Sequence, residues 1–219
     1  MRGQHGSRKA ARTAQGPEFR ELGAFLALAG QWIADYRNTA SVMPSSPQLA
    51  RAMVRPAVAR NAKVFVEFGP GTGPMTEVIL DELPKDGELL SFEINPVFVE
   101  YLATHFPDPR LRVIPQGAET AVESLKEHGH THADAVISSL PLSFFPQEMR
   151  ERILSTAAQS LRPGGVFTQF QYASGLDCSG KFPKPYDLRP LLGKYFPRVR
   201  RHLVWKNLPP AFVYTCSPA

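Results

Sequence analysis

The chain has 219 residues, of which 43% are hydrophobic, and this is enough for one well-buried domain with a short appendage. Its two cysteines, Cys178 and Cys216, have no metal-ligand spacing, which argues against both a disulfide framework and a zinc site. No apolar run approaches the roughly 20 residues of a membrane span. A reducing cytoplasm is therefore the simplest expected location.

Positive charge is concentrated at the two ends of the chain, although the formal net charge is only +5. Residues 1–60 carry nine Lys/Arg against three Asp/Glu, residues 61–180 carry eight against sixteen, and residues 181–219 carry eight against one. This asymmetry predicts that the two ends share a face that meets an anionic partner, either nucleic acid or a membrane surface. An ordinary charged, soluble surface is the alternative interpretation.

The N-terminal region is expected to contain a basic, disordered tail at residues 1–16, followed by a helix and lid region at residues 17–56. Apolar residues recur at three- and four-residue spacing from 17 to 36, which predicts an amphipathic helix carrying Phe19, Phe25 and Trp32. Aromatic residues on such a face, beside basic residues, favour an interfacial membrane helix, although a lid packed over the core fits the same pattern. A second, short helix is expected from a Ser45 or Ser46 cap to about Val54.

Strands and helices alternate from residue 57 to the C-terminus, and this part is expected to form the main domain. Strands are predicted at residues 63–68, 88–93, 111–115, 133–138 and 166–172, with helices between them at 74–83, 96–105, 119–128 and 146–161. Such alternation requires right-handed crossovers and a parallel sheet covered by helices on both faces. A Lys/Pro-rich linker, a helix near 187–195 and two last strands at 200–205 and 211–216 complete an α/β domain.

The first of these strands runs into a glycine-rich loop, Glu67-Phe68-Gly69-Pro70-Gly71-Thr72-Gly73. Glycines at alternate positions allow positive φ angles and a close approach of the backbone to a ligand. Their spacing differs from the Gly-x-Gly-x-x-Gly that seats a dinucleotide pyrophosphate. Glu67 repels phosphate but can accept hydrogen bonds from a ligand ammonium group. S-adenosylmethionine, which has a cationic sulfonium and an amino-acid tail, fits this polarity.

Later strands are expected to place further ligand contacts nearby, because ligands of open α/β sheets bind beyond the carboxyl ends of the strands. Glu93, followed by Ile94, ends the second strand twenty residues after Gly73, where a carboxylate can bind both ribose hydroxyls. After the third strand, Gly117-Ala118-Glu119 offers a small-residue floor and a polar edge for adenine. A simple helix cap is the alternative at this last position.

The loop after the fourth strand, residues 138–146, is unusually apolar for a surface segment. Its sequence is Ser138-Ser139-Leu140-Pro141-Leu142-Ser143-Phe144-Phe145-Pro146. A surface loop has no physical reason to be so hydrophobic unless it is covered or binds something apolar. We expect this loop to line the place where a methyl acceptor meets the sulfonium.

The glycine loop, the acid after strand two and the Leu-Pro after strand four resemble class I S-adenosylmethionine-dependent methyltransferases, especially the branch of the ribosomal RNA adenine dimethyltransferases. Residues 39–53, 138–142 and 207–214 resemble more closely the soluble, membrane-associated bacterial phosphatidylethanolamine N-methyltransferases. The Asn-Leu-Pro-Tyr of the adenine dimethyltransferases is absent, since Ser139 replaces the Asn and Leu142 the aromatic. This removes the side chains expected to hold a planar base.

The resemblance implies a Rossmann-like class I methyltransferase fold, with a seven-stranded, mostly parallel sheet. It also implies S-adenosylmethionine as cofactor, S-adenosylhomocysteine as product and no metal. The expected cofactor-binding residues are Glu67, Phe68, Gly69, Gly71, Gly73, Glu93, Ile94, Gly117, Ala118, Glu119 and Ser138. The expected catalytic residues are Tyr36, Ser139, Leu140 and Pro141. Those expected to meet substrate or membrane are Phe19, Phe25, Trp32, Arg37, Phe144, Phe145 and Tyr172.

The implied reaction is N-methylation of phosphatidylethanolamine and its mono- and dimethyl derivatives, towards phosphatidylcholine, at the inner leaflet of the cytoplasmic membrane. The implied partners are a phospholipid substrate and an anionic membrane surface, and no nucleic acid is expected. As methyl groups accumulate, the head group becomes a quaternary cation, for which an aromatic wall is suited. Two alternatives stay open: adenine N6-methylation of ribosomal RNA, and a cofactor-binding membrane protein without catalysis.

Overall fold

The computed structural model describes residues 45–173, 176–177, 184–185 and 187–218. The predicted tail and the predicted helix at 17–36 lie outside these residues. So do five of the predicted site residues, namely Phe19, Phe25, Trp32, Tyr36 and Arg37.

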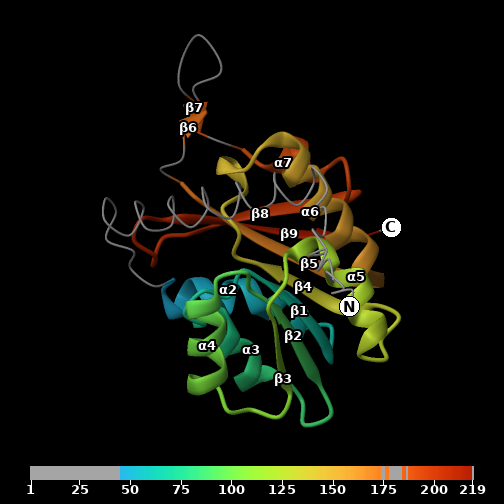
Figure 1. The fold of residues 1–219 in the computed structure, drawn as a ribbon. Coiled ribbons are helices and arrows are strands. Elements are labelled where there is room, and N and C mark those ends of the chain that lie inside the picture. Colours follow the sequence, from blue (N-terminus) through green and yellow to red (C-terminus); the bar gives the residue numbers. More distant parts are fainter. Residues whose placement is uncertain (1–44, 174–175, 178–183, 186, 219) are drawn as a thin grey trace, which may run out of the picture. The chain divides into compact units, whose positions relative to one another are not determined.

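A seven-stranded sheet forms the centre of the described chain (Figure 1). Its strands are β1 (Val64–Phe68), β2 (Glu88–Phe92), β3 (Leu111–Ile114), β4 (Ala133–Ser138), β5 (Leu161–Tyr172), β8 (Arg198–Val204) and β9 (Ala211–Ser217). They lie in the order β3-β2-β1-β4-β5-β9-β8. The first five pair in parallel, and β9 is antiparallel to both of its neighbours. The predicted mostly parallel sheet is confirmed, and its strand order reverses between β1 and β4, which is where such sheets bind ligands.

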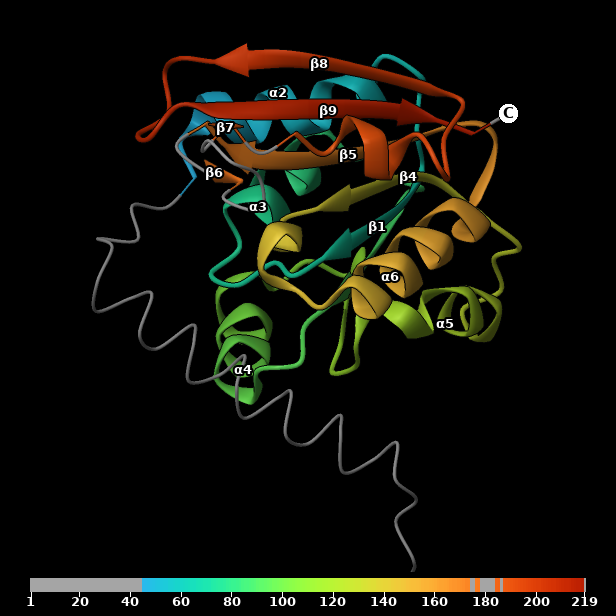
Figure 2. The ribbon, with the colours of Figure 1, turned by 90° about the horizontal axis from the view of Figure 1, so that it is seen from above.

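Helices cover both faces of this sheet (Figure 2). One face packs against α2 (Pro47–Val58) and α3 (Pro74–Glu82), and the other against α5 (Ala121–Glu127), α6 (Gln147–Ser160) and α7 (Arg189–Leu192). The remaining helical elements are α4 (Pro96–His105) and two short 3₁₀ turns, η1 (Ala118–Thr120) and η2 (Leu142–Phe144). The two-residue period of a strand assigns side chains to these faces, so Val66 and Phe68 face α6 whereas Phe65 and Glu67 face α3.

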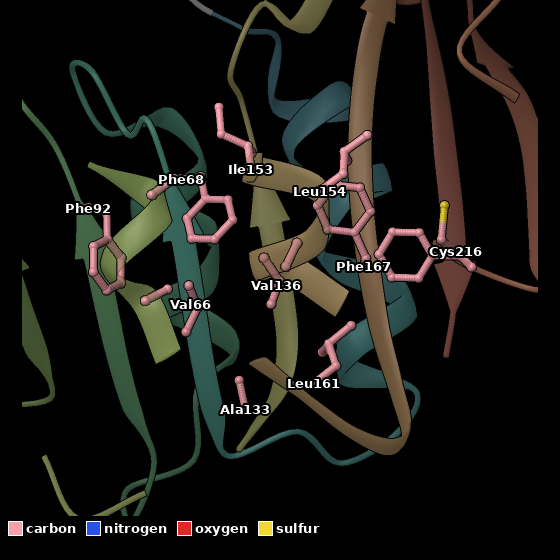
Figure 3. Close-up of a cluster of buried hydrophobic side chains, with 14 of the residues drawn as sticks. Val66, Phe68, Phe92, Ala133, Val136, Ile153, Leu154, Leu161, Phe167 and Cys216 are labelled. Atoms are coloured by element: carbon pink, nitrogen blue, oxygen red, sulfur yellow. The ribbon is translucent and has the colours of Figure 1, made fainter. Parts of the chain in front are cut away.

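The face under α6 holds a core of aromatic and aliphatic side chains (Figure 3). Phe68 meets Phe92 edge to face, with ring centroids 5.9 Å apart, and Phe167 stacks on Phe196 at 5.1 Å. Phe68 and Phe167 have no exposed surface. This core fixes β1, β2, β4 and β5 relative to one another and therefore fixes the loops that leave their ends.

Helix α2 is longer than its sequence suggested, because it continues from Ser46 to Val58 and includes Pro56. Leu49 and Met53 are fully buried against the sheet, and this tertiary burial outweighs the preference of proline for a helix end. Helix α2 therefore packs as part of the same unit as the sheet, although its sequence suggested a place in the lid region.

Three other elements differ from the sequence expectation. Strand β5 begins at Leu161 rather than at residue 166, because residues 162–165 form an irregularity within the β4–β5 pairing, with Gly164 at φ +77°. Helix α7 has only four residues, whereas a helix near 187–195 was expected, because the residues after Leu192 continue in tighter turns. The expected linker contains a two-stranded sheet of β6 (Leu176–Asp177) and β7 (Lys184–Pro185).

We predict that Phe167→Ala lowers the free energy of unfolding by about 3–5 kcal/mol, because it removes a fully buried ring that stacks on Phe196. Urea denaturation followed by circular dichroism measures this cost. Phe167→Leu keeps most of the volume and should cost only about 1 kcal/mol. Equal costs for the two variants would contradict the packing role.

Candidate active site

The loops that follow β1, β2 and β4 meet at one edge of the sheet, towards which these strands point (Figure 2). The register places Phe68 beside Phe92 on one side and beside Ser138 on the other. Two backbone hydrogen bonds continue this pairing into the loops, since Gly69 N–H donates to Phe92 O at 3.0 Å and Ser139 N–H donates to Phe68 O at 2.9 Å. The structure therefore brings together the three segments that the sequence singled out.

The glycine loop has three left-handed residues, because Gly69, Gly71 and Gly73 have φ angles of +68°, +58° and +84°. A Cβ on Gly69 would lie 2.6 Å from Leu140 Cδ2, and one on Gly73 would lie 2.4 Å from the Phe106 ring. A Cβ on Gly71 would meet no atom within 4 Å. The outer two glycines thus permit close packing within the protein, whereas the backbone of Gly71 faces open space that a ligand can use.

Glu93 connects this loop to the end of β2. Its Oε2 accepts from Gly71 N–H at 3.1 Å and its Oε1 accepts from Asn95 N–H at 2.9 Å. The side chain is only 7% exposed, and burial raises the pKa of the carboxyl group, with the backbone donors opposing this effect. Each carboxylate oxygen has a second lone pair, so Glu93 can orient the loop and still accept ligand hydroxyls.

Glu67 is fully buried near the carboxyl end of β1. Its Oε2 accepts from the hydroxyls of Thr76, at 2.8 Å, and Ser91, at 2.6 Å. No group in the described part of the chain donates to its Oε1. Burial raises the pKa of Glu67 to about 7, and the charge of Glu93 adds to the rise, while the two hydroxyls oppose it. A buried carboxylate with one unpaired oxygen suits a cationic hydrogen-bond donor.

The segment after β3 contains the three residues predicted to face adenine. Gly117 precedes η1, Ala118 is buried, and the carboxylate of Glu119 lies over Gly117, where a Cβ would come within 2.3 Å of either carboxylate oxygen. Gly117 has no side chain with which to cap η1, and the Thr120 hydroxyl instead donates to Gly117 O at 2.9 Å. A larger residue at Gly117 would displace the Glu119 carboxylate.

The loop after β4 divides into an inner and an outer part. Leu142 is fully buried and Phe145 packs against the core, whereas Pro141 is exposed and Phe144 is 55% exposed. The hydroxyls of Ser138 and Ser139 are buried and have no hydrogen-bond partner among the described residues. This loop thus combines unpaired polar atoms with an apolar outer surface.

Tyr172, predicted to meet substrate or membrane, lies at the end of β5, half-buried, with its ring edge to face with that of Phe170 at 5.3 Å. Ile94 is 40% exposed after β2. The structure thus places both residues at the same edge as the other loops.

Sequence reasoning missed Gln169, which lies beside Ser138 in the β4–β5 register and is fully buried. Its Nε2 donates to Leu140 O at 2.9 Å, and its Oε1 has no partner in the described residues. Thr76 and Ser91, the partners of Glu67, were missed as well. For Ser91 the available signal was a polar side chain between apolar ones in its strand, whereas β5 also contains Thr168 and Gln171, so no such signal marked Gln169.

Comparison with known proteins identifies the family. A family model described as a methyltransferase domain matches residues 66–167. The ornithine lipid N-methyltransferase of Singulisphaera acidiphila is 31% identical over 193 residues, which cover 88% of this chain and 95% of that protein. The chain belongs to the class I S-adenosylmethionine-dependent methyltransferases. The predicted cofactor and reaction class are thereby confirmed.

Two other similarities are more limited. Ribosomal RNA small subunit methyltransferase H of Aromatoleum aromaticum is 31% identical over 105 residues, which cover 46% of this methyltransferase and 33% of that protein. The crystal structure of human methyltransferase-like protein 13, in complex with S-adenosylhomocysteine, has a TM-score of 0.56 at 18% identity, covering 78% of this chain and 82% of that chain. The second similarity supports the fold alone.

The residues at the edge fit S-adenosylmethionine. We infer that Glu67 Oε1 accepts from its ammonium group, that Gly71 leaves backbone space for it, and that Glu93 accepts from its ribose hydroxyls. No cluster of three or more His, Cys, Asp or Glu that could hold a metal occurs in the described residues.

We predict that Gly71→Ala weakens binding of S-adenosylhomocysteine by roughly tenfold or more, because the added methyl group would occupy the open space that we assign to the ligand. Isothermal titration calorimetry measures this affinity. Gly129→Ala is the matched control, because Gly129 also has a positive φ, +82°, and open space around its Cβ. Both variants should lose about 1 kcal/mol of stability through backbone strain. Equal affinities in the two variants would contradict the assignment.

We predict that stability falls as the pH rises from about 4.5 to about 7, because the unfolded chain has released the Glu67 proton in this window while the folded protein keeps it. The effect is on the order of 3 kcal/mol, is complete above pH 7, and should be absent in Glu67→Gln. Thermal unfolding at pH 5 and pH 8 measures it. Glu77→Gln, at an exposed position of α3, should behave as the wild type. The same pH dependence in Glu67→Gln and the wild type would exclude Glu67 as the source.

Proposed function

We propose that this methyltransferase transfers methyl groups to phosphatidylethanolamine and its mono- and dimethyl derivatives, towards phosphatidylcholine, at the surface of the cytoplasmic membrane. The similarity to an ornithine lipid N-methyltransferase, along most of both chains, carries the proposal. Phosphatidylethanolamine and ornithine lipid both present a primary amine on a lipid head group. The same chemistry at the nitrogen therefore serves either lipid.

The loop after β4 supports an apolar acceptor. Leu140 packs against Gly69 of the glycine loop, and Pro141 and Phe144 continue from it towards solvent. An acceptor that enters along this loop therefore reaches the glycine loop past apolar side chains. A lipid suits such an entrance better than a water-soluble amine does.

Methyl transfer requires a neutral amine held in line with the methyl group. When bound, S-adenosylmethionine would supply an electrophilic methyl carbon, and formation of the N–C bond would break the C–S bond and leave a thioether. In the first two transfers the nitrogen would then release one proton to water, whereas in the third the neutral tertiary amine has no proton to release and becomes a quaternary ammonium. The Ser139 hydroxyl, which has no hydrogen-bond partner among the described residues, and the backbone carbonyl of Leu140 are proposed to accept from the N–H groups of the primary and secondary amines. The Gln169 amide holds that carbonyl in a fixed direction, so the contribution of the chain is orientation.

The membrane contact is proposed to involve the basic ends and the helix predicted at residues 17–36. Tyr36, at the end of this helix, and Arg37, the residue after it, stay candidates for contact with the head group. Phe144, exposed at the acceptor loop, is a further candidate for contact with a methylated ammonium. Within the described residues, no helix has the length and apolarity needed to cross a bilayer.

Methylation of ribosomal RNA is a second candidate, favoured by the similarity to ribosomal RNA small subunit methyltransferase H over a third of that protein. The loop after β4 argues against it. Leu142, which stands at the position of a base-stacking aromatic, is fully buried in the core and cannot stack on a base.

We predict that the purified protein, given methyl-labelled S-adenosylmethionine, labels the lipid of phosphatidylethanolamine liposomes, with mono-, di- and trimethylated products separable by chromatography. Ornithine lipid liposomes and ribosomal RNA are tested in parallel. Label in ornithine lipid alone would correct the substrate, and label in RNA alone would favour the second candidate. Cofactor binding without transfer to any acceptor would indicate a non-catalytic protein.

A further inference from the structure

The turn between β8 and β9 exposes two large apolar side chains that the cofactor site does not use. Trp205 is 74% exposed and Leu208 is 66% exposed, and only Lys206 and Asn207 separate them. Because β8 is antiparallel to β9, and β9 is antiparallel to β5, strand β8 runs in the direction of the parallel strands. Its turn therefore leaves the sheet at the same edge as the glycine loop (Figure 2).

This turn has a fixed base. Asn207 is buried, its Oδ1 accepts from Ser46 N–H at 2.9 Å, and its Nδ2 donates to Pro209 O at 2.7 Å. The Ala173 N–H donates to Pro210 O at 2.8 Å, which joins the turn to the end of β5. Trp205 and Leu208 thus project from a base that is held to α2 and β5.

The other exposed apolar side chains have the same distribution. Among the large hydrophobic residues that the described chain exposes, all but Tyr101 lie within a few residues of the carboxyl end of β2, β4 or β8. They are Ile94, Val97, Phe144, Trp205 and Leu208, and we call this set the apolar edge. Single exposed hydrophobic residues are ordinary, but a set that collects on one edge marks an interaction surface.

The charge near the turn fits an anionic partner. Residues 194–206 contain five Lys or Arg residues and no Asp or Glu. However, Lys194 pairs with Glu151, and Arg198 opens β8 at the opposite edge of the sheet, which leaves Arg200, Arg201 and Lys206 nearer the turn. Arg201 is partly neutralised, since it lies 3.6 Å from Asp187 and over the Phe212 ring, whereas Lys206 is exposed within the turn itself. Segments that lie in the head-group layer of an anionic bilayer typically combine Trp and Leu with neighbouring Lys residues.

We propose that Trp205 and Leu208 insert into the head-group layer of an anionic membrane, with Lys206 at the level of the lipid phosphates. This inference rests on the proposed function and extends it, because it adds a membrane contact at the cofactor edge to the one proposed for residues 17–36. With the apolar edge on the bilayer, the amine of a lipid reaches the loop after β4 without its acyl chains leaving the membrane.

A single-tryptophan variant tests the insertion directly. The chain has two tryptophans, so Trp32→Phe leaves Trp205 as the only indole. We expect vesicles of phosphatidylethanolamine and phosphatidylglycerol to shift the Trp205 emission to the blue, and brominated lipids in the same vesicles to quench it. Flotation with these vesicles while the emission stays unshifted and unquenched would overturn the proposal, and so would a shift with ribosomal RNA but not with vesicles.

The double variant Trp205→Ala with Leu208→Ala tests how much these two side chains contribute to vesicle affinity. We expect vesicle affinity to fall by roughly tenfold or more, with binding of S-adenosylhomocysteine unchanged. Tyr101→Ala, at the exposed aromatic of α4 outside the apolar edge, should leave vesicle affinity unchanged. Circular dichroism checks that the double variant folds. The single variant Trp205→Phe keeps an aromatic ring and should retain most of the vesicle affinity of the wild type. Unchanged affinity in the double variant would overturn the proposal.

These results separate the inference from the proposed function. Insertion of Trp205 without methyl transfer to any lipid supports the membrane contact and rejects the lipid reaction. Methyl transfer to liposomes supports the reaction. If the Trp205 emission does not respond to vesicles and the double variant keeps its vesicle affinity, the contact is rejected.

Discussion

The buried carboxylate of Glu67 links the stability of the core to occupation of the site. Its Oε2 is held by Thr76 and Ser91, while Oε1 is buried with no donor among the described residues. Burial raises the pKa to about 7, so near neutral pH the ionised form costs free energy that the fold itself does not fully offset. A cationic ligand group beside Oε1 offsets that cost, and a ligand that binds only the folded state stabilises it by mass action. Cofactor binding and folding stability are therefore expected to rise together.

The glycine loop and the loop after β4 are joined through one residue. Leu140 packs its side chain against Gly69, and its carbonyl accepts from the buried amide of Gln169. Since Gly71 is in turn held by Glu93, a continuous set of contacts runs from β2 through the glycine loop to β5. A displacement transfer needs alignment of nitrogen, carbon and sulfur more than it needs an acid or a base. A rigid pair of loops can supply this alignment.

Local chemistry made much of the fold predictable from the sequence. The helix at 96–105 has its predicted bounds because Asn95 caps it, accepting from Val97 N–H at 3.0 Å, and Pro96 opens it. The glycine loop was predictable because left-handed residues and close packing demand glycine. The extension of α2 past Pro56 was not, because it depends on burial of Leu49 and Met53 against the sheet, which no local pattern reveals.

The site was predictable where a residue type suits only a few roles, and was missed where partners come from distant strands. Glu67 and Glu93 stood out as acids at strand ends. Gln169 and Ser91 did not, because a polar residue in a strand ordinarily faces solvent, and only the folded register turns these two inwards. The aromatic residues proposed for the N-terminal helix lie outside the described residues, so their part in the site stays a prediction.

The distribution of exposed apolar residues bears on the choice between lipid and RNA. A polyanion is bound by cations and by aromatic rings on which bases stack, so RNA can account for Trp205 and Lys206. It does not account for Ile94, Val97 and Leu208, which can neither stack nor pair with phosphate and would stay in water. The apolar interior and head-group layer of a bilayer can receive all five kinds of side chain in the apolar edge, while its anionic head groups can pair with the exposed Lys206. The amine of a membrane lipid lies at that same depth, so a methyltransferase whose cofactor edge is also its membrane edge does not need to extract its substrate.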